Sequence, residues 1–271
     1  MKLLSGQEIA GFIKERQALE VRSLVQAGHV QPKLAIVLTI DHPVIEVYVK
    51  KKKRYGADIG VDVDIHQVNQ DDVPALLKKL NKDASVHGII VQLPLERSDE
   101  TDDIVNLVAP DKDVDALGKK AEFDPATPMA ILWLLAGYNV ELQGKKILLI
   151  GRGRLVGAPL EKMLLTMGHD VTVIDRETKD LATETLQADV IITATGSPAI
   201  LYPNMVKLGA VIVDAGVAGE GGKTVGDVAP EMFEREDLTI TPAKGGVGPL
   251  TVCALFDNVI RSARRTASGR N

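Results

Sequence analysis

Short apolar runs that alternate with helical segments are the strongest constraint on how this chain folds. The expected order in the first half is helix 6–28, strand 34–39, helix 43–59, strand 61–68, helix 73–80 and strand 88–93. The strands at 34–39 and 88–93 are continuous apolar runs, and 61–68 alternates apolar with polar residues. Apolar strands separated by helices are typical of parallel sheets covered on both sides. The first half is therefore predicted to be α/β.

A second series of the same kind begins near residue 145. Its expected elements are strand 146–150, helix 158–167, strands 171–174, 190–193 and 211–213, and a final helix over 250–264. Polar, proline-marked segments at 111–115 and 124–128 are expected to be loops, followed by a bridging helix at 131–136. A length of 271 residues is sufficient for two domains, and we expect the boundary between them near residue 140.

Composition narrows the class of protein further. With 45% hydrophobic residues, 25% charged residues and a net charge of −5, the chain resembles an ordinary globular protein and gives no reason to expect nucleic acid. Cys253 is the single cysteine, which excludes internal disulfides and favours a reducing cytoplasm. We also expect no signal peptide and no membrane association, because no apolar run is long enough.

The turn Gly151-x-Gly-x-x-x-Gly157 lies between a predicted strand and a predicted helix. In that context the amides at the helix start can bind a pyrophosphate, which favours a Rossmann-type dinucleotide site over a plain tight turn. Asp175 follows the next strand, where a carboxylate would accept a hydrogen bond from a ribose 2′-hydroxyl and favour NAD. Arg176 could instead pair with the 2′-phosphate of NADP, and Asp175 could be an ordinary loop carboxylate.

A second glycine-rich segment, residues 245–249, precedes the last predicted helix. Its three glycines and one proline could let the backbone approach a ligand closely, or could form only a tight loop.

Lys52 stands apart from the basic run around it. Val44, Tyr48, Tyr55 and Ile59 form an apolar stripe along the predicted helix, and Lys52 falls on that stripe. An inward lysine beside an aromatic ring and other cations is expected to have a lowered pKa, as a general acid or base at neutral pH requires. Lys51, at the opposite edge of the stripe, is the other candidate for this role. The simpler alternative is that Lys52 only extends its side chain along an apolar face.

Two further polar residues occupy places where ligands bind. Gln92 ends an apolar strand, at the edge of the sheet where parallel sheets bind ligands, although it could simply cap the strand. Asp115 shares a loop with Asp111 and Asp113, but no histidine or cysteine accompanies them. We therefore expect Asp115 to recognise a hydrogen-bond-donating substrate, and we expect no metal.

The chain resembles the bifunctional methylenetetrahydrofolate dehydrogenase/methenyltetrahydrofolate cyclohydrolase family, through motifs that follow the family order and span nearly the whole chain. The matching segments are Tyr48-x-x-x-Lys52, 91–95, 112–115, 125–128, Gly151-Arg-Gly with 156–159, 194–196, 226–228 and 245–251.

The resemblance implies two α/β domains joined by two long helices, with the folate cleft between them. Residues 1–139, completed by helix 250–271, would form the catalytic, folate-binding domain, and 140–249 the NAD(P)-binding domain. The implied reaction is oxidation of 5,10-methylenetetrahydrofolate with NADP or NAD, followed by hydrolysis to 10-formyltetrahydrofolate. The resemblance further implies a cytoplasmic homodimer that serves one-carbon metabolism and purine biosynthesis.

The resemblance also implies roles for individual residues. Lys52 would assist water addition and ring opening, Gln92 would tune its protonation, Tyr48 would stack on the folate, and Asp115 would hold the pterin ring. The other implied substrate-binding residues are Val91, Leu93, Gly248 and Pro249. The implied cofactor-binding residues are Gly151, Arg152, Gly153, Gly157, Asp175, Arg176, Thr195, Gly196, Val217 and Thr251.

Several positions depart from the usual family pattern. They are Val44 and Ile45 in place of Ala-Ser, Glu96 in place of proline, Ala116 in place of glycine, Gly153 in place of serine, 175–177 in place of Cys-His-Ser, and Lys244 in place of proline. The changes at Gly153, Asp175 and Glu177 make NAD, or use of both cofactors, a serious hypothesis. The alternatives are a single-activity pterin dehydrogenase and a non-catalytic folate- or nucleotide-binding protein. The presence of Lys52, Gln92 and Asp115 argues against the non-catalytic alternative.

Overall fold

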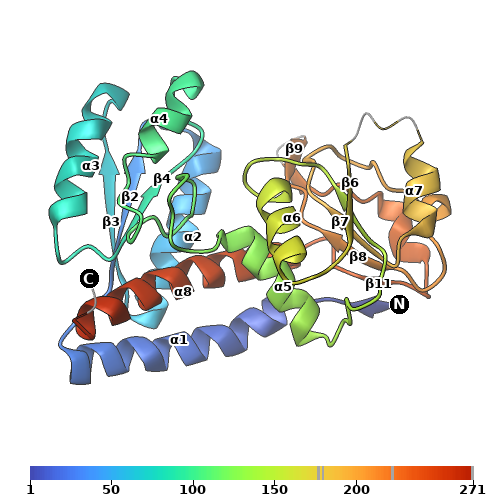
Figure 1. The fold of residues 1–271 in the computed structure, drawn as a ribbon, viewed down its shortest axis with the longest axis horizontal. Coiled ribbons are helices and arrows are strands. Elements are labelled where there is room, and N and C mark those ends of the chain that lie inside the picture. The colour runs from blue at the N-terminus through green and yellow to red at the C-terminus, as the bar shows by residue number, and fades with distance from the viewer. Residues whose placement is uncertain (176–177, 179, 221–222, 270–271) are drawn as a thin grey trace. The chain divides into compact units, whose positions relative to one another are not determined.

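The computed structural model describes residues 1–175, 178, 180–220 and 223–269, and it confirms the α/β class. The chain packs as two compact units (Figure 1). Residues 11–126 and 252–271 form what we call the three-stranded unit, and residues 1–10 and 127–251 form the six-stranded unit. These units differ from the predicted domains in placing residues 1–10 and 127–139 with the nucleotide-binding segment. The predicted domain boundary stays a prediction.

The three-stranded unit is built on a parallel sheet with the order β3-β2-β4. Its strands are β2 (Lys33–Leu38), β3 (Asp62–Gln67) and β4 (Gly88–Val91). Helix α2 (Pro43–Ile59) connects β2 to β3, and α3 (Val73–Lys82) connects β3 to β4. Each crossover contains a helix, as parallel neighbours require.

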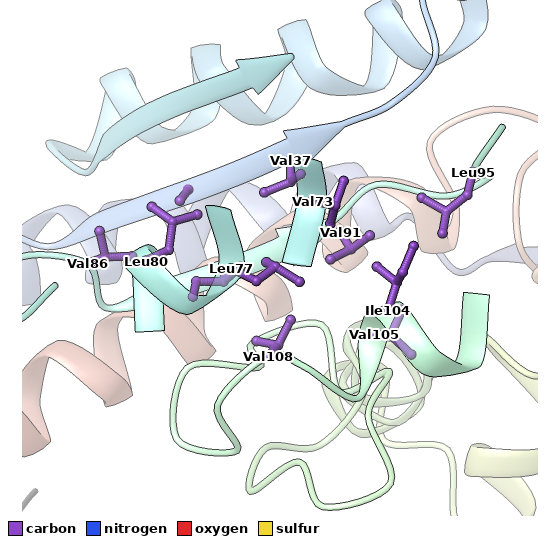
Figure 2. Packing of buried hydrophobic residues seen from close by; sticks show 12 residues of the cluster. Val37, Val73, Leu77, Leu80, Val86, Val91, Leu95, Ile104, Val105 and Val108 are labelled. Atoms are coloured by element: carbon purple, nitrogen blue, oxygen red, sulfur yellow. The ribbon is translucent and has the colours of Figure 1, made fainter. Parts of the chain in front are cut away.

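One face of this sheet is covered by α3 and the short helix α4 (Thr101–Val105), as Figure 2 shows. Val37 of β2 and Val91 of β4 belong to the same buried cluster as Leu77 of α3 and Ile104 of α4. On the other face, a Cβ added to Gly88 would lie 3.1 Å from Val259 of α8 (Val247–Ala267). Strands β2 and β4 are therefore buried on both faces, which explains why they lack a polar face, whereas no residue of the edge strand β3 is fully buried.

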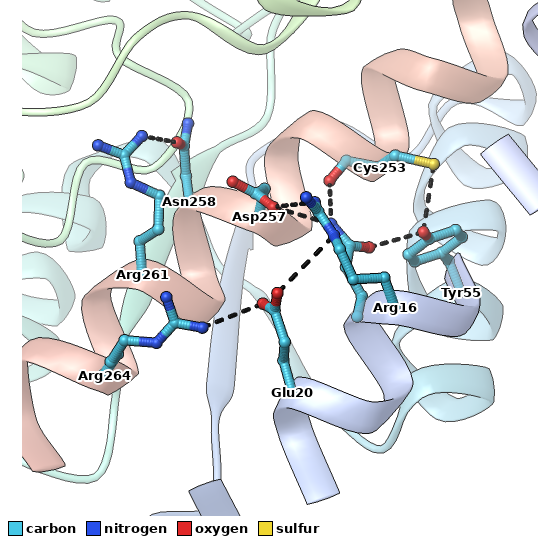
Figure 3. Close-up of polar contacts among 9 residues, drawn as sticks. Arg16, Glu20, Tyr55, Cys253, Asp257, Asn258, Arg261 and Arg264 are labelled. Atoms are coloured by element: carbon cyan, nitrogen blue, oxygen red, sulfur yellow. Dashed lines mark hydrogen bonds and ion pairs between the residues drawn. The ribbon is translucent and has the colours of Figure 1, made fainter. Parts of the chain in front are cut away.

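Tyr55 anchors α2 to the remaining helices of this unit (Figure 3). Its hydroxyl donates to Gln17 Oε1 at 2.7 Å and lies 3.2 Å from Cys253 Sγ, and Gln17 Nε2 donates to the Cys253 carbonyl at 2.8 Å. Gln17 lies on α1 (Gly6–Gly28) and Cys253 on α8. Because these buried polar groups are paired, they fix the position of the helix that carries Lys52.

The six-stranded unit is built on a second parallel sheet, with the order β1-β11-β8-β7-β5-β6. Its strands are β1 (Lys2–Leu3), β5 (Ile147–Ile150), β6 (Val171–Ile174), β7 (Val190–Thr193), β8 (Val211–Asp214) and β11 (Thr239–Ile240). The helices are α5 (Ala126–Gly137), α6 (Gly157–Thr166) and α7 (Leu181–Gln187), and a hairpin pairs β9 (Ala218–Glu220) with β10 (Lys223–Val225).

Two helices begin well before their predicted starts. Residues 126–128 were expected to be loop, but α5 begins at Ala126, and α8 begins at Val247 rather than Leu250. In both cases the misleading residue is a proline, Pro128 or Pro249, in the first turn of the helix. A proline there sacrifices no helical hydrogen bond, so it marks a helix start as readily as a loop. None of the described helices is long and apolar enough to span a membrane.

Candidate active site and nucleotide site

Lys52 is the lysine of α2 that turns towards the protein. It is partly buried, whereas its neighbours Lys51 and Lys53 are exposed. The Lys52 Nζ donates a 2.7 Å hydrogen bond to Gln92 Oε1, and Gln92 Nε2 donates to the Leu93 carbonyl at 2.9 Å. Gln92 directly follows β4, so the second bond orients the amide with its oxygen towards Lys52.

The electrostatics of this group follow from burial. Burial lowers the pKa of Lys52 below its ordinary value, and the nearby Asp115 partly offsets the effect. Burial likewise raises the pKa of Asp115, and Lys52 opposes that shift. The lysine pKa thus moves in the direction expected from the sequence, with burial rather than neighbouring cations as its main cause.

Asp113 organises the loop that carries Asp115. Its buried carboxylate accepts hydrogen bonds from the amides of Gly118, at 2.7 Å, and Leu117, at 3.4 Å. Burial raises the pKa of Asp113 to about 6 despite these bonds. Ala116 adopts a left-handed φ of 55° within this loop. Sequence reasoning missed this structural role, although the close spacing of Asp113 and Asp115 was its signal.

Tyr48 is 40% exposed and lies one turn before Lys52 on α2. The apolar stripe predicted an inward-facing side chain at Tyr48, and that prediction is wrong. Tyr55 and Ile59 of the same stripe do turn inwards. The Lys51 ammonium lies 5.7 Å from the centre of the Tyr48 ring. An exposed ring beside the lysine group is suited to stack on a flat heterocycle.

The glycines of the turn after β5 are required by close packing. Gly151 has a φ of +100°, and a Cβ added to it would lie 2.8 Å from the Ala194 carbonyl oxygen. A Cβ on Gly157, the first residue of α6, would lie 2.0 Å from the Gly151 carbonyl oxygen. Gly153 has open space around it. The turn thus brings the start of α6 against the end of β5, as a dinucleotide pyrophosphate requires.

Other predicted cofactor residues follow the neighbouring strands. Thr195 and Gly196 come after β7, and Gly196 has a φ of +66°. Val217, after β8, is 58% exposed. Because β7 pairs in parallel with β5, and β8 pairs in parallel with β7, the carboxyl ends of all three strands lie at the edge of the sheet that carries the glycine turn. These residues fit a dinucleotide cofactor.

Asp227 is a residue of this site that sequence reasoning did not single out. Its buried Oδ2 accepts from the Thr195 amide at 2.7 Å and from the Thr195 hydroxyl at 2.9 Å, while Oδ1 has no hydrogen-bond partner among the described groups. Burial raises the pKa of Asp227. The motif Gly226-Asp-Val228 was the available signal.

The segment before α8 is held to the start of α1. The Gln7 amide donates to the Gly245 carbonyl at 2.9 Å, and a Cβ on Gly6 would lie 1.9 Å from the Gly246 carbonyl oxygen. Gly248 and Pro249 lie in the first turn of α8, and the Thr251 hydroxyl lies 3.4 Å from that of Thr127. Arg152 and Asp175 are both exposed, and Arg176 lies outside the described residues.

A lysine–amide–carboxylate group in the three-stranded unit, with a glycine turn suited to a dinucleotide in the six-stranded unit, points to a two-domain, dinucleotide-dependent enzyme. The model of the tetrahydrofolate dehydrogenase/cyclohydrolase catalytic domain matches residues 4–115, and that of the NAD(P)-binding domain matches residues 125–267. The chain therefore belongs to the tetrahydrofolate dehydrogenase/cyclohydrolase family, as its motifs predicted.

Individual relatives agree with the family models. The bifunctional protein FolD of Acholeplasma laidlawii is 38% identical over 270 residues, which cover 95% of this chain and 96% of that protein. The crystal structure of the FolD dehydrogenase/cyclohydrolase from Campylobacter jejuni is similar with a TM-score of 0.92 and 36% identity, over 98% of this chain and 99% of that one. The Trypanosoma brucei FolD complexed with NADP and inhibitor has a TM-score of 0.91 and 28% identity, over 99% and 98%.

Proposed function

We propose that this enzyme oxidises 5,10-methylenetetrahydrofolate with NAD(P)+ and hydrolyses the resulting 5,10-methenyl cation to 10-formyltetrahydrofolate. The observation that carries the proposal is the Lys52–Gln92 hydrogen bond with Asp115 close by, in a chain that also carries the dinucleotide turn. A non-catalytic binding protein has no need of a lysine whose pKa is lowered.

The oxidation transfers a hydride from the one-carbon bridge of the folate. When bound, NAD(P)+ supplies the hydride acceptor, and the bridge becomes the methenyl cation. The residues proposed to bind it are those of the glycine turn, Gly151 to Gly157, with Thr195, Gly196, Val217 and Thr251. Asp227 acts through Thr195, because it holds both the amide and the hydroxyl of that residue in place.

The hydrolysis adds water to the methenyl carbon. One water O–H bond breaks as the new C–O bond forms, and the proton passes to a base. The neutral amine of Lys52 is the proposed base, and its ammonium form can then protonate the nitrogen that leaves as the ring opens. As that C–N bond breaks, the new hydroxyl forms the formyl C=O bond and releases its proton to water, so that the positive charge of the methenyl cation leaves as one proton. The Gln92 oxygen accepts from Lys52 in either protonation state, so it keeps Nζ directed at one point.

The remaining substrate contacts are also proposals. Tyr48 stacks on the folate, and Asp115 binds the donor groups of the pterin. Leu93, Gly248 and Pro249 complete the contacts. The Val91 side chain is only 2% exposed, so we assign it the support of Gln92 rather than direct contact.

Replacement of Lys52 by methionine tests the assignment. Lys52→Met is expected to lower methenyl hydrolysis by at least ~100-fold, because general acid–base catalysis contributes about that much. Oxidation should continue, so that the methenyl product accumulates and its absorbance rises. Lys53→Met, at an exposed residue of the same helix, is the matched control and should hydrolyse normally. Unchanged hydrolysis in Lys52→Met would refute the role of the lysine.

We further propose that the enzyme is a cytoplasmic homodimer and that its 10-formyl product serves purine biosynthesis. The single cysteine supports a reducing compartment. Light scattering of the purified protein tests the dimer: a mass near twice the chain mass of 29.1 kDa is expected, and one near 29.1 kDa would refute it.

A further inference from the structure

Arg152, the charged residue of the glycine turn, is paired with a carboxylate of the following helix. Its Nε lies 2.8 Å from Glu161 Oε2, and its Nη2 donates to Glu161 Oε1 at 3.2 Å. The Glu161 side chain is 18% exposed and that of Arg152 is 67% exposed. Two bonds in this fork geometry hold the guanidinium better than one would, and they occupy donors that a phosphate would otherwise use.

Arg152 and Glu161 line one cavity together with Asp175. The cavity has a volume of about 350 Å³, and Val171, Val173 and Ile174 of β6 form the rest of its lining. Asp175 directly follows β6. Strand β6 pairs in parallel with β5, the strand that the glycine turn follows. In Rossmann-type domains, an acidic residue at the end of this second strand binds the adenosine ribose of the dinucleotide.

The charges around this cavity favour a hydroxyl over a phosphate. Among the residues that the structure describes, its lining contributes two carboxylates and one guanidinium, a formal balance of −1. A phosphate monoester carries a charge of about −1.5 to −2 at neutral pH, and both carboxylates would repel it. A ribose 2′-hydroxyl can instead donate to the Asp175 carboxylate.

We infer that Glu161 is a specificity-determining residue for the cofactor. It holds the guanidinium of Arg152 and, with Asp175, makes the ribose end of the site accept NAD and reject NADP. The inference rests on the proposed function only in that the cofactor is a nicotinamide dinucleotide. It extends the hypothesis about Asp175, because it explains why an arginine in the glycine turn does not favour the 2′-phosphate.

Calorimetric titration with NAD+ and NADP+ measures this preference without catalysis. The unmodified protein is expected to bind NAD+ at least ~10-fold more tightly than NADP+, equivalent to about 1.4 kcal/mol. The same titration is repeated with two fragments of the cofactors, adenosine 5′-monophosphate and adenosine 2′,5′-bisphosphate. These fragments differ only in the 2′-phosphate. Because the discrimination is electrostatic, it should shrink as the salt concentration rises.

Glu161→Gln keeps the size of the side chain and removes its charge. We expect NADP+ to bind roughly 10-fold more tightly to this variant, with NAD+ affinity changed less than ~3-fold, and a further gain for NADP+ on adding Asp175→Ser. Glu231→Gln removes the same charge from an exposed residue of the same unit and should leave the ratio unchanged. Thermal unfolding of each variant confirms that it is folded.

Preference of the unmodified protein for NADP+, or an unchanged ratio in folded Glu161→Gln, would overturn the inference. Loss of NADP+ binding on Arg176→Ala would do so too, since that result assigns the 2′-phosphate to Arg176. Binding in the expected ratio without formation of methenyl product would support the inference and refute the proposed oxidation. If neither dinucleotide binds, both fail.

Discussion

At the scale of the residue, Lys52 shows how position on a helix selects one lysine from a basic run. Lys51 and Lys53 remain in solvent, whereas Lys52 turns inwards and meets Gln92. Burial disfavours the ammonium and lowers the pKa of Lys52, so the neutral amine forms at a lower pH than in an exposed lysine. The rate of methenyl hydrolysis should therefore rise with pH through this lowered pKa and level off above it.

Gln92→Glu tests that pH dependence. A carboxylate beside Nζ stabilises the ammonium and raises the pKa of Lys52, so the rise in rate should move to higher pH by about 1 unit or more. The rate of methenyl hydrolysis is measured from about pH 6 to about pH 9, and the rate of the uncatalysed reaction is subtracted at each pH. Gln67→Glu makes the same replacement at an exposed residue of this unit and should not move the profile. An unmoved profile in Gln92→Glu would contradict the coupling.

Ala116 supplies a prediction about stability. Its φ of 55° is left-handed, a conformation that costs an L-residue about 1–2 kcal/mol. Ala116→Gly removes that strain, but it also raises the conformational entropy of the unfolded chain, which offsets part of the gain. We therefore expect the free energy of unfolding in urea to rise by about 0.5–1 kcal/mol. Ala18→Gly, in the middle of α1, should lower it by about 1 kcal/mol. A loss of stability in Ala116→Gly would show that the methyl group makes a compensating contact.

At the scale of the element, the glycine turn depends on how closely α6 approaches the end of β5. Gly157→Ala places a Cβ 2.0 Å from the Gly151 carbonyl oxygen, so the turn must shift. We expect the free energy of unfolding without cofactor to fall by about 1–3 kcal/mol, together with weaker dinucleotide binding. Gly153→Ala meets nothing within 4 Å and should be neutral in the same unfolding experiment. Equal stability of the two variants would contradict the packing argument.

Element boundaries could be predicted only where the side-chain pattern was strong. Helix α2, strand β6 and strand β7 lie where the periodicity placed them. The two-residue strands β1 and β11 could not be predicted, because each is a strand only by pairing with a partner remote in sequence. The short helices α4 and α7 span too few turns to show a clear periodic pattern.

At the scale of the whole molecule, the two units carry different parts of the proposed chemistry. Lys52, Gln92 and Asp115 belong to the three-stranded unit, and the glycine turn and Thr195 belong to the six-stranded unit. NAD+ alone should therefore slow amide hydrogen exchange mainly in 151–157 and 194–197, because bound ligand suppresses local opening. Slowing around Lys52 and Asp115 without any slowing at the glycine turn would contradict this assignment.

The sequence by itself determined the α/β class, the two series of strands and the family, because apolar periodicity and glycine spacing are local properties of the chain. It also singled out Lys52 and Gln92, which lie 40 residues apart. The family resemblance already implied that Gln92 acts on Lys52, but only the tertiary structure decided that the contact is a direct hydrogen bond. Only the tertiary structure, too, decided that Asp113 shapes the loop of Asp115 and that Glu161 holds Arg152. Those pairings depend on burial and on contacts between separate elements, which no local pattern records.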